Sequence, residues 1–308
     1  MEQVVTSPLS IERPIWLYDL PKEFIITSLS TYFDSPCPWE AVNQDYSVWK
    51  CSETGLEFCW PLEPGNKIFY QWLSNFNSYY PSERWEYKKV ISRFNTLGRS
   101  SSSILDVGCG DGSFLRLAST HGFKNVFGLD FNQDSIQKCL RFGFSAFCGS
   151  IDHAVSSGVL KKNTFDFITS FHCLEHVQNP VLFVNELFEL LVQKGRLFLS
   201  TPFSPMSFEK YWFDIMNHPP HHMTRWNLRS YEKLASILNL RISFYYPRAS
   251  ALRQVIQIYH LLYFRFKPFK KRDFFDLLYF FKLFFDCLSS NRFHSLKGSD
   301  VILVELYR

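Results

Sequence analysis

The chain has 308 residues, with 33 Lys and Arg against 29 Asp and Glu, and therefore a formal net charge of +4. That charge is too small to indicate a nucleic-acid partner by itself. The length suits one large domain or two small ones. The first residues are polar and no apolar run of about 18 residues occurs, so we expect neither a signal segment nor a membrane span. The eight cysteines are scattered, which favours free thiols in the cytoplasm.

Two cysteine-containing turns near the start of the chain resemble the knuckles of a zinc ribbon. They begin at Cys37 and Cys51, but Glu40 and Thr54 stand where the second cysteine of each knuckle should be. Two thiolates and a carboxylate make a poor structural zinc site, and Cys59 has the wrong spacing to complete it. We therefore expect a ribbon-like segment without a bound metal, which keeps its shape by packing.

Aromatic residues crowd the segment 67–94, which follows the ribbon-like turns. Those from Trp72 to Tyr80 recur near helical spacing. Such spacing predicts an amphipathic helix whose apolar face packs on the core.

The stretch 103–115 has the pattern of a strand, a glycine turn and a helix. An apolar run ends at Val107, three glycines alternate over the next five residues, and apolar residues at helical spacing follow. Alternating glycines let the backbone approach a ligand, and the N–H groups that open the helix would face that ligand. A second predicted strand ends at Asp130, 20 residues after Gly110, where a carboxylate commonly binds ribose hydroxyls. Together these features predict a nucleoside-bearing cofactor.

The glycine turn departs from the dinucleotide-binding pattern. Ser113 occupies the position of the third glycine in G-x-G-x-x-G, and Asp106 lies two residues before the first glycine. An acid before the turn and N–H groups within it suit an amino-acid zwitterion better than a pyrophosphate. At this point the sequence resembles the class I S-adenosylmethionine-dependent methyltransferases, whose acid-x-G-x-G-x-G signature is matched by Asp106, Gly108, Gly110 and Gly112.

The resemblance continues downstream of the glycine turn. It includes the segments 165–177, 179–180 and 195–202, which carry further motifs of the family in the expected order. It implies that S-adenosyl-L-methionine is the cofactor. It also implies the ribbon ahead of the catalytic domain, since many bacterial methyltransferases of this kind carry one.

The resemblance further implies which residues contact the cofactor. They come from the glycine turn and from the ends of the strands that follow it: Asp106, Gly108, Cys109, Gly110, Gly112, Asp130, Phe131, Ser150, Ile151 and Phe171. In related methyltransferases the segment before the first strand closes over the cofactor. Tyr79, Tyr80 and Trp85 are the candidates for such a lid, because a tyrosine offers both a ring and a hydroxyl.

Predicted strands and helices alternate after residue 98. Strands are expected at 104–107, 126–129, 145–148, 165–171, 197–200, 241–245 and 301–306, and helices from 114 and at 132–142, 180–192 and 228–238. This alternation predicts an α/β fold, a Rossmann-like seven-stranded mostly parallel sheet with helices on both faces. We divide the chain into an N-terminal ribbon-like and helical cap, residues 1–98, and a methyltransferase domain, residues 99–308.

A helical insertion at about 247–297 interrupts the methyltransferase domain before its last strand. A basic run at 265–272 leads into 273–288, where apolar residues form one face of a helix and acidic residues lie on the other. This pattern predicts a helix that packs on the domain or on the mate in a homodimer. The alternative is peripheral membrane contact, because a basic run beside a bulky apolar face is typical of membrane-binding surfaces.

Four histidines are candidates for a catalytic base. His172 and His176 follow the fourth predicted strand, and His221 and His222 lie in a proline-stiffened loop after the fifth. Methyl transfer from a sulfonium to a hydroxyl needs alignment of the acceptor and removal of its proton. Imidazole is the natural base near neutral pH. Related small-molecule enzymes carry a similar P-P-H-H segment beside the acceptor, which places His221 and His222 first.

The function that we expect is S-adenosylmethionine-dependent methylation of a small molecule, at an oxygen of a sugar, glycan precursor or secondary metabolite. Two alternatives stay open: N-methylation of a small amine, and a non-catalytic methyltransferase-like binding subunit. The intact Asp106, glycines and Asp130 weigh against the second alternative. A nucleic-acid acceptor is not expected, because no N-P-P-Y or D-P-P-Y motif follows the fourth predicted strand.

Overall fold

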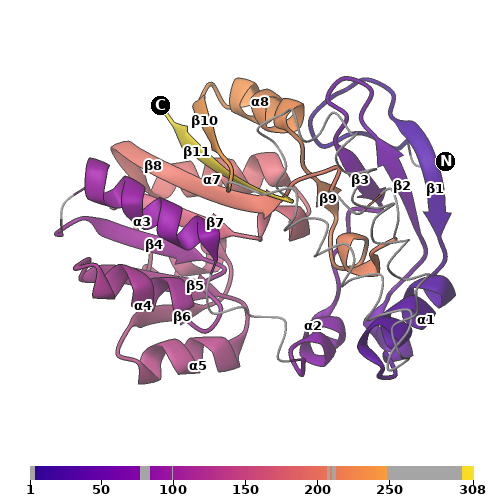
Figure 1. The fold of residues 1–308 in the computed structure, drawn as a ribbon, viewed down its shortest axis with the longest axis horizontal. Helices are drawn as coiled ribbons and strands as arrows, with labels where there is room; N and C mark the ends of the chain where they lie inside the picture. Colours follow the sequence, from indigo (N-terminus) through magenta and orange to yellow (C-terminus); the bar gives the residue numbers. More distant parts are fainter. Residues whose placement is uncertain (1–3, 77–83, 99, 207–208, 210–212, 248–299) are drawn as a thin grey trace, which may run out of the picture.

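A computed structural model of the chain describes residues 4–76, 84–98, 100–206, 209, 213–247 and 300–308. Within these residues, two sheets of seven and four strands lie side by side (Figure 1). The larger sheet has the strand order β10-β11-β8-β7-β4-β5-β6. Its strands are β4 (Ser103–Val107), β5 (Asn125–Asp130), β6 (Ser145–Cys148), β7 (Phe165–Phe171), β8 (Leu191–Pro202), β10 (Arg241–Tyr245) and β11 (Val301–Tyr307).

The larger sheet is mostly parallel. β4 pairs in parallel with β5 and β7, and the pairs β5–β6 and β7–β8 are parallel as well. Only β11 runs against its neighbours β8 and β10. β7 is buried along nearly its whole length, as is typical of a parallel strand covered on both faces. The predicted α/β, Rossmann-like seven-stranded fold is confirmed.

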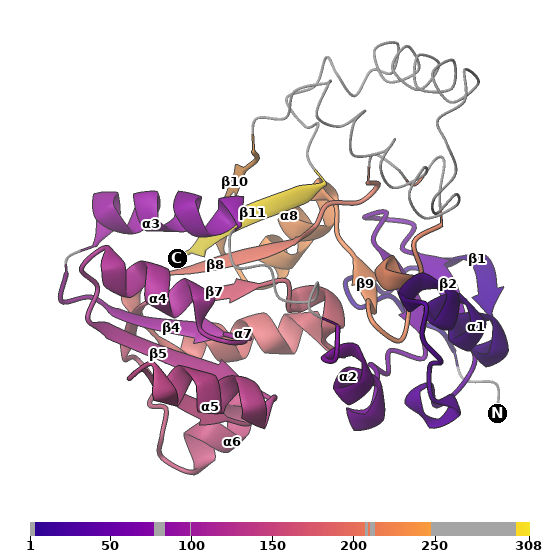
Figure 2. The same ribbon diagram turned by 60° about the horizontal axis from the view of Figure 1, so that its bottom comes forward.

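Helices cover both faces of this sheet. One face carries α3 (Trp85–Leu97), α4 (Ser113–Thr120) and α5 (Gln133–Arg141), and the other carries α6 (Ile151–Ser156), α7 (Pro180–Leu190) and α8 (Leu228–Ile237). Successive strand residues point to opposite faces, so Ile104 packs with the first set of helices and Leu105 with the second. α3 and α4 lie next to each other over the sheet (Figure 2).

The join between α7 and β8 differs from its prediction. The sequence predicts a helix to residue 192 and a strand from 197, whereas α7 ends at Leu190 and β8 begins at Leu191. Leu191 has an extended backbone (φ −75°, ψ 142°) and pairs with Phe165. Pairing with β7 therefore replaces the last turn of the predicted helix.

The smaller sheet has the order β1-β2-β3-β9, and its pairs are antiparallel. Its strands are β1 (Ile15–Leu20), β2 (Tyr46–Lys50), β3 (Glu57–Trp60) and β9 (Thr224–Arg225). β9 comes from the segment after β8, so this sheet combines three N-terminal strands with a strand from the second half of the chain. Two helices, α1 (Lys22–Phe33) and α2 (Lys67–Leu73), pack in the same apolar cluster as Ile215 and Met223 from that loop.

The cysteines of the ribbon-like segment are buried and reduced. Cys51 begins the turn of the β2–β3 hairpin, and Thr54 accepts a hydrogen bond there from the N–H of Leu56 at 3.1 Å. Burial raises the pKa of Cys37 to about 11 and also raises the pKa of Cys59, which favours the thiol over the metal-binding thiolate. Among the described residues, these cysteines form no group with the spacing of a metal site. The absence of zinc from this segment stays a prediction.

Some predicted features lie outside the described residues. These are Tyr79 and Tyr80 of the proposed lid and nearly all of the insertion, including 265–272 and 273–288. The third lid candidate, Trp85, is the first residue of α3 and packs against the cluster beneath that helix. In the part of the chain that the structure describes, no helix has the length and hydropathy needed to cross a membrane.

Candidate active site

The glycine turn after β4 has a backbone that favours glycine. Gly108, Gly110 and Gly112 have φ angles of 77°, 52° and 79°. A Cβ atom on Gly108 would lie 2.1 Å from Cys173 Sγ, and one on Gly112 would lie 2.9 Å from Cys139 Sγ. The turn therefore needs glycine both for its backbone angles and for its close packing.

Several N–H groups of this turn already donate to protein acceptors, which differs from our expectation that they face a ligand. Gly108 and Cys109 donate to the carbonyl oxygen of Leu129, at 2.7 and 3.1 Å. Ser113, the first residue of α4, donates its N–H to Asp111 Oδ1 at 3.1 Å. Asp111 binds an N–H group only two residues ahead of it, a local hydrogen bond that the glycine motif does not reveal. Fewer polar groups are left for a ligand than the motif suggests.

Asp130, the last residue of β5, ties the glycine turn to the next helix. Its Oδ2 accepts a hydrogen bond from the N–H of Gly110 at 2.8 Å, and its Oδ1 accepts one from Asn132 at 2.8 Å. Burial raises the pKa of Asp130, while these hydrogen bonds act in the opposite direction. Each carboxylate oxygen has a further lone pair, so the group can also accept hydrogen bonds from hydroxyls.

Asp106 is a buried carboxyl group near the end of β4, only 2% exposed. Thr169 on β7 donates a hydrogen bond to its Oδ1 at 2.7 Å. Burial is the main cause that raises the pKa of Asp106 to about 8, and the charge of Asp130 adds to the effect. A nearby cation would reverse this shift. The side chain therefore fits the ammonium group of an amino-acid ligand.

The other predicted cofactor residues lie at the same edge of the sheet. Cys109 is buried in the glycine turn, and Phe131 follows β5 with its side chain 78% exposed. Ser150 caps the N-terminus of α6 with its hydroxyl, and Ile151 is the first residue of that helix. Phe171 is the last residue of β7. The structure thus brings all the predicted cofactor residues to the carboxyl ends of β4, β5, β6 and β7.

His172 directly follows β7 and lies between two buried carboxylates. Its Nε2 is 2.9 Å from Glu86 Oε1, on α3, and its Nδ1 is 3.4 Å from Glu175 Oε1. Its φ of 53° is uncommon for a residue with a side chain. Burial acts to lower the pKa of His172, but Glu175 and Glu86 outweigh it and the pKa is raised. The imidazole is therefore stabilised in its charged form.

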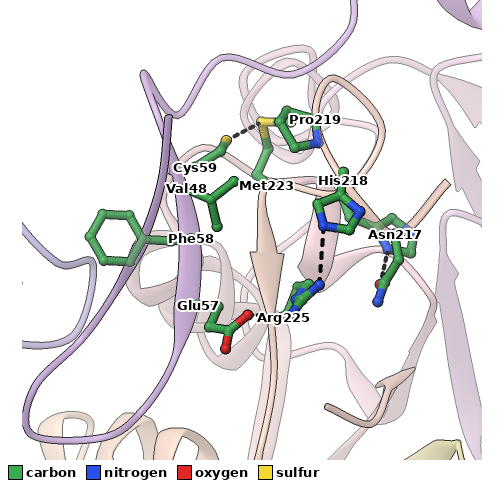
Figure 3. Close-up of a pocket in the computed structure, with 10 residues that line it drawn as sticks. Val48, Glu57, Phe58, Cys59, Asn217, His218, Pro219, Met223 and Arg225 are labelled. Atoms are coloured by element: carbon green, nitrogen blue, oxygen red, sulfur yellow. Dashed lines mark hydrogen bonds and ion pairs between the residues drawn. The ribbon is translucent and has the colours of Figure 1, made fainter. Parts of the chain in front are cut away.

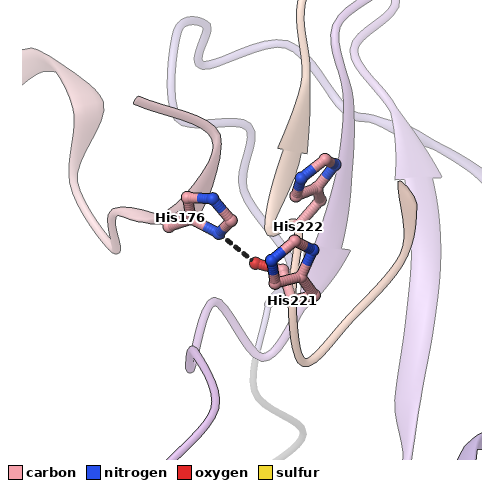
Figure 4. Close-up of side chains that lie close together, drawn as sticks. All are labelled: His176, His221 and His222. Atoms are coloured by element: carbon pink, nitrogen blue, oxygen red, sulfur yellow. Dashed lines mark hydrogen bonds between the residues drawn. The ribbon is translucent and has the colours of Figure 1, made fainter. Parts of the chain in front are cut away.

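His176, His221 and His222 form a second group, which we call the histidine cluster (Figure 4). One ring nitrogen of each lies within 4.8 Å of those of the other two. The ring centroids are 4.5 to 4.9 Å apart. Burial is the main cause that lowers the pKa of His221 and of His222 well below 6.5, so both rings are neutral at pH 7.

A short segment after β7 connects the glycine turn to the histidine cluster. Cys173 lies against Gly108, as the close approach of its Sγ shows. Three residues later, in the 3₁₀ helix η2 (Leu174–His176), His176 contacts the carbonyl oxygen of His221 through Nδ1 at 2.5 Å. Three residues span at most about 11 Å. The backbone of Cys173, which touches the glycine turn, is therefore at most about 11 Å from that of His176, which belongs to the histidine cluster.

A small pocket adjoins the cluster on the side of the four-stranded sheet, and His222 is among its lining residues (Figure 3). Arg225 pairs there with Glu57 and approaches His218 Nε2 at 3.2 Å. Burial, helped by the charge of Arg225, lowers the pKa of His218 to about 3. His218 is therefore neutral, and Tyr18 hydroxyl lies 2.8 Å from its Nε2. The pocket wall is made by β2, β3 and the segment 217–223, which we call the histidine loop.

Sequence reasoning missed three parts of this site. Glu86 carries no motif and stands among aromatic residues, so nothing in the sequence pairs it with His172. Thr169 is one residue within a buried strand, and its partner Asp106 was identified without it. The four histidines were identified singly as bases, but the contrast between His172, which is stabilised in its charged form, and the neutral His221 and His222 depends on tertiary contacts.

Comparison with known proteins agrees with this geometry. Residues 80–243, more than half of the chain, match the Methyltransferase domain family. A methyltransferase from Archaeoglobus fulgidus, described as SAM-dependent, is 16% identical with a TM-score of 0.50, covering 72% of this chain and 94% of that one. The plantazolicin methyltransferase BpumL is 16% identical with a TM-score of 0.51, covering 79% and 92%. At this identity the two structures are evidence for the fold alone. No curated protein sequence gives a significant match.

The fold, the glycine turn and the family match define a class I methyltransferase domain. The chain belongs to this methyltransferase family, and it is an S-adenosylmethionine-dependent methyltransferase.

Proposed function

We propose that the protein methylates an oxygen of a small molecule, such as a sugar, a glycan precursor or a secondary metabolite. The observation that carries this proposal is the segment from Phe171 to His176, which touches the glycine turn at Cys173 and the histidine cluster at His176. A methyl donor at the turn and a hydroxyl acceptor beside the cluster would then be neighbours. Proximity and alignment of this kind supply much of the rate enhancement in a displacement reaction.

The cofactor fits the residues at the sheet edge. Asp106 is a buried carboxyl whose charged form a cation would stabilise, and the ammonium group of S-adenosylmethionine is such a cation. Asp130 would accept hydrogen bonds from the ribose hydroxyls with the lone pairs that Gly110 and Asn132 leave. The cofactor supplies an electrophilic methyl group, and the protein's task is to orient the acceptor and accept its proton.

A neutral imidazole of the histidine cluster would accept that proton. Nδ1 of His221 lies 2.8 Å from the carbonyl oxygen of Met216, so Nδ1 carries the hydrogen and Nε2 the lone pair. The same argument applies to His222, whose Nδ1 lies 2.9 Å from Asn217 Oδ1. His172 is already paired with Glu86 and Glu175. We therefore assign His221 or His222 as the base and His172 as a positioning residue.

The smaller sheet would serve as the cap of the acceptor site. We keep the division into a cap, residues 1–98, and a methyltransferase domain, residues 99–308, with β9 pairing the histidine loop to β3.

A reducing compartment, the cytoplasm, is supported by the free thiols of the described cysteines, of which Cys109 and Cys139 are buried beside the glycine turn.

The test is a screen of hydroxylated sugars, sugar nucleotides and amines with radiolabelled S-adenosylmethionine, followed by kinetics on single variants. We expect His221→Ala or His222→Ala to lower kcat by about 10²–10⁴-fold, the usual effect of losing a general base. The affinity for the cofactor, measured by calorimetry, should not change. His121→Ala is the matched control, because His121 is exposed at the end of α4.

Two outcomes would contradict the assignment. If both variants keep full kcat while His172→Ala or His176→Ala loses it, the base belongs to the segment after β7. If none of the four matters, the enzyme works by proximity alone. An amine acceptor would then be favoured, because the lone pair of a neutral amine can attack the methyl group before any proton is removed.

A further inference from the structure

Each imidazole of the histidine cluster is anchored through Nδ1. The acceptors are the carbonyl oxygen of His221 for His176, at 2.5 Å, that of Met216 for His221, at 2.8 Å, and Asn217 Oδ1 for His222, at 2.9 Å. A carbonyl oxygen can only accept, so Nδ1 is the protonated nitrogen and Nε2 is the one able to bind a ligand. Histidines that bind metals almost always show this arrangement, with the second nitrogen donating to a carbonyl or carboxylate.

We propose that His176, His221 and His222 together bind one divalent transition-metal ion through their Nε2 atoms. One ring nitrogen of each histidine already lies within 4.8 Å of those of the other two. In a tetrahedral zinc site, nitrogen ligands are about 3.3 Å apart, as follows from Zn–N distances of about 2.05 Å. The ring nitrogens therefore have to approach one another by up to about 1.5 Å around an ion, a shift that side-chain rotations can supply.

The backbone that carries the three rings is fixed by its own hydrogen bonds. The N–H groups of His221 and His222 both donate to the carbonyl oxygen of His218, at 3.1 and 3.0 Å. Met223, the next residue, donates to the carbonyl oxygen of Glu175 at 2.7 Å, which joins the histidine loop to η2. Ligands held on a fixed frame of this kind lose little freedom when an ion binds.

The ligand set indicates which ions fit. Three imidazoles without a carboxylate suit zinc, cobalt, nickel or copper, and they do not suit magnesium or calcium, which require oxygen ligands. Three protein ligands leave a fourth position for water or for a substrate oxygen, which is the arrangement of catalytic zinc sites. The sequence analysis assigned no metal ligand, because the two halves of this set are 45 residues apart.

This inference goes beyond the proposed function and does not depend on it. A bound ion would occupy the Nε2 lone pairs that a histidine base needs, and a hydroxyl at the fourth position would then be activated by the ion. Metal binding needs neither cofactor nor methyl acceptor. A failed metal test therefore leaves the proposed imidazole base intact, and a failed kinetic test leaves the metal site intact.

The experiment uses the full chain without an affinity tag, stripped with a chelator and dialysed. Co²⁺ is titrated in while visible absorption is recorded, and Zn²⁺ loading is measured by elemental analysis after gel filtration. We expect one ion of Co²⁺ or Zn²⁺ per chain, with weak visible bands and no thiolate charge-transfer absorption in the near ultraviolet. His176→Ala, His221→Ala and His222→Ala should each weaken binding by about 100-fold or more.

Two controls keep the inference falsifiable even if a cluster variant fails to fold. His153→Ala removes an exposed histidine and should bind the ion like the parent chain, and the Cys37→Ser/Cys51→Ser pair should do so too. The parent chain decides the matter without any variant: less than a tenth of an equivalent of Zn²⁺ after loading at a twofold excess would overturn the proposal. Binding that survives in folded cluster variants and disappears with the cysteine pair would also overturn it.

Discussion

Asp106 illustrates how a residue proposed to bind a ligand can lower the stability of the folded chain. Its pKa is raised to about 8, chiefly by burial, against an ordinary value of 3.8. Between these values the folded chain keeps a proton that the unfolded chain has released. The folded state therefore loses stability as the pH rises from about 4 to about 8, and no further loss follows above that pH.

We predict that Asp106→Asn stabilises the protein without its cofactor and weakens binding of S-adenosylmethionine. Asparagine keeps an oxygen for the hydrogen bond from Thr169 but has no charge to bury. The free energy of unfolding at pH 8 should increase by about 2–4 kcal/mol, and the gain should shrink as the pH falls towards 4. Urea denaturation across this pH range measures the first effect, and calorimetry with the cofactor measures the second.

Asp134→Asn is the comparison for this prediction, since Asp134 is an exposed carboxylate on α5. Its stability difference from the parent chain should stay small at every pH. If the stability difference of Asp106→Asn is equally small at every pH, then Asp106 is ionised in the folded chain even without a cationic ligand.

At the scale of the element, the glycine turn shows how packing adds to backbone conformation. Gly108 combines a φ of 77° with the Sγ atom of Cys173 at the position of a missing Cβ. Gly143, at the end of α5, has a similar φ of 83° and nothing within 4 Å of a built Cβ. A residue with a Cβ would be strained by the left-handed backbone at both positions. Only at position 108 would that Cβ also clash with another atom, the Sγ of Cys173.

We predict that Gly108→Ala destabilises the protein more than Gly143→Ala. Gly143→Ala should cost about 1–2 kcal/mol, the price of the left-handed conformation. Gly108→Ala should cost about 1–3 kcal/mol more, because the new methyl group overpacks the contact with Cys173. Chemical denaturation measures both, and Gly108→Ala/Cys173→Ala should recover most of the difference. If the double variant recovers nothing, the collision is not what Gly108 avoids.

The elements differ in how well the sequence predicts them. β6, β7 and β10 have the predicted bounds, because apolar runs between turn residues are a local property. The two-residue strand β9 could not be predicted, since Thr224 and Arg225 are a strand only through pairing with Phe58 and Glu57. The cofactor residues lie on contiguous motifs and were found. The partnership of Glu86 with His172, and the assembly of the histidine cluster, depend on contacts between distant segments and were not.

At the scale of the whole molecule, the pairing of β3 with β9 joins the N-terminal strands of the smaller sheet to the segment of the methyltransferase domain that leads into α8. Three kinds of contact make this joint. They are the β3–β9 pairing, a hydrogen bond from the N–H of Cys59 to the carbonyl oxygen of Met223 at 2.9 Å, and the ion pair of Arg225. Arg225 pairs with Glu57 on β3, and its guanidinium lies 3.8 Å from Glu209. Its side chain is only 13% exposed, so this pair is well shielded from solvent.

We predict that Arg225→Ala loosens the joint while the larger sheet stays intact. Removing the shielded partner leaves Glu57 with only the more exposed Lys50 beside it, at a cost of about 2–4 kcal/mol. The backbone hydrogen bonds of the joint remain, so the loss should appear as local opening. In hydrogen exchange followed by mass spectrometry, peptides covering 46–60 and 218–226 should exchange faster, and peptides covering 103–130 should not.

Lys50→Ala is the matched control, because Lys50 also faces Glu57, at 3.8 Å, but is 45% exposed and should matter little. Equal acceleration in both sheets would instead mean that they unfold as one cooperative unit, and the smaller sheet could then not move as a cap over the histidine cluster.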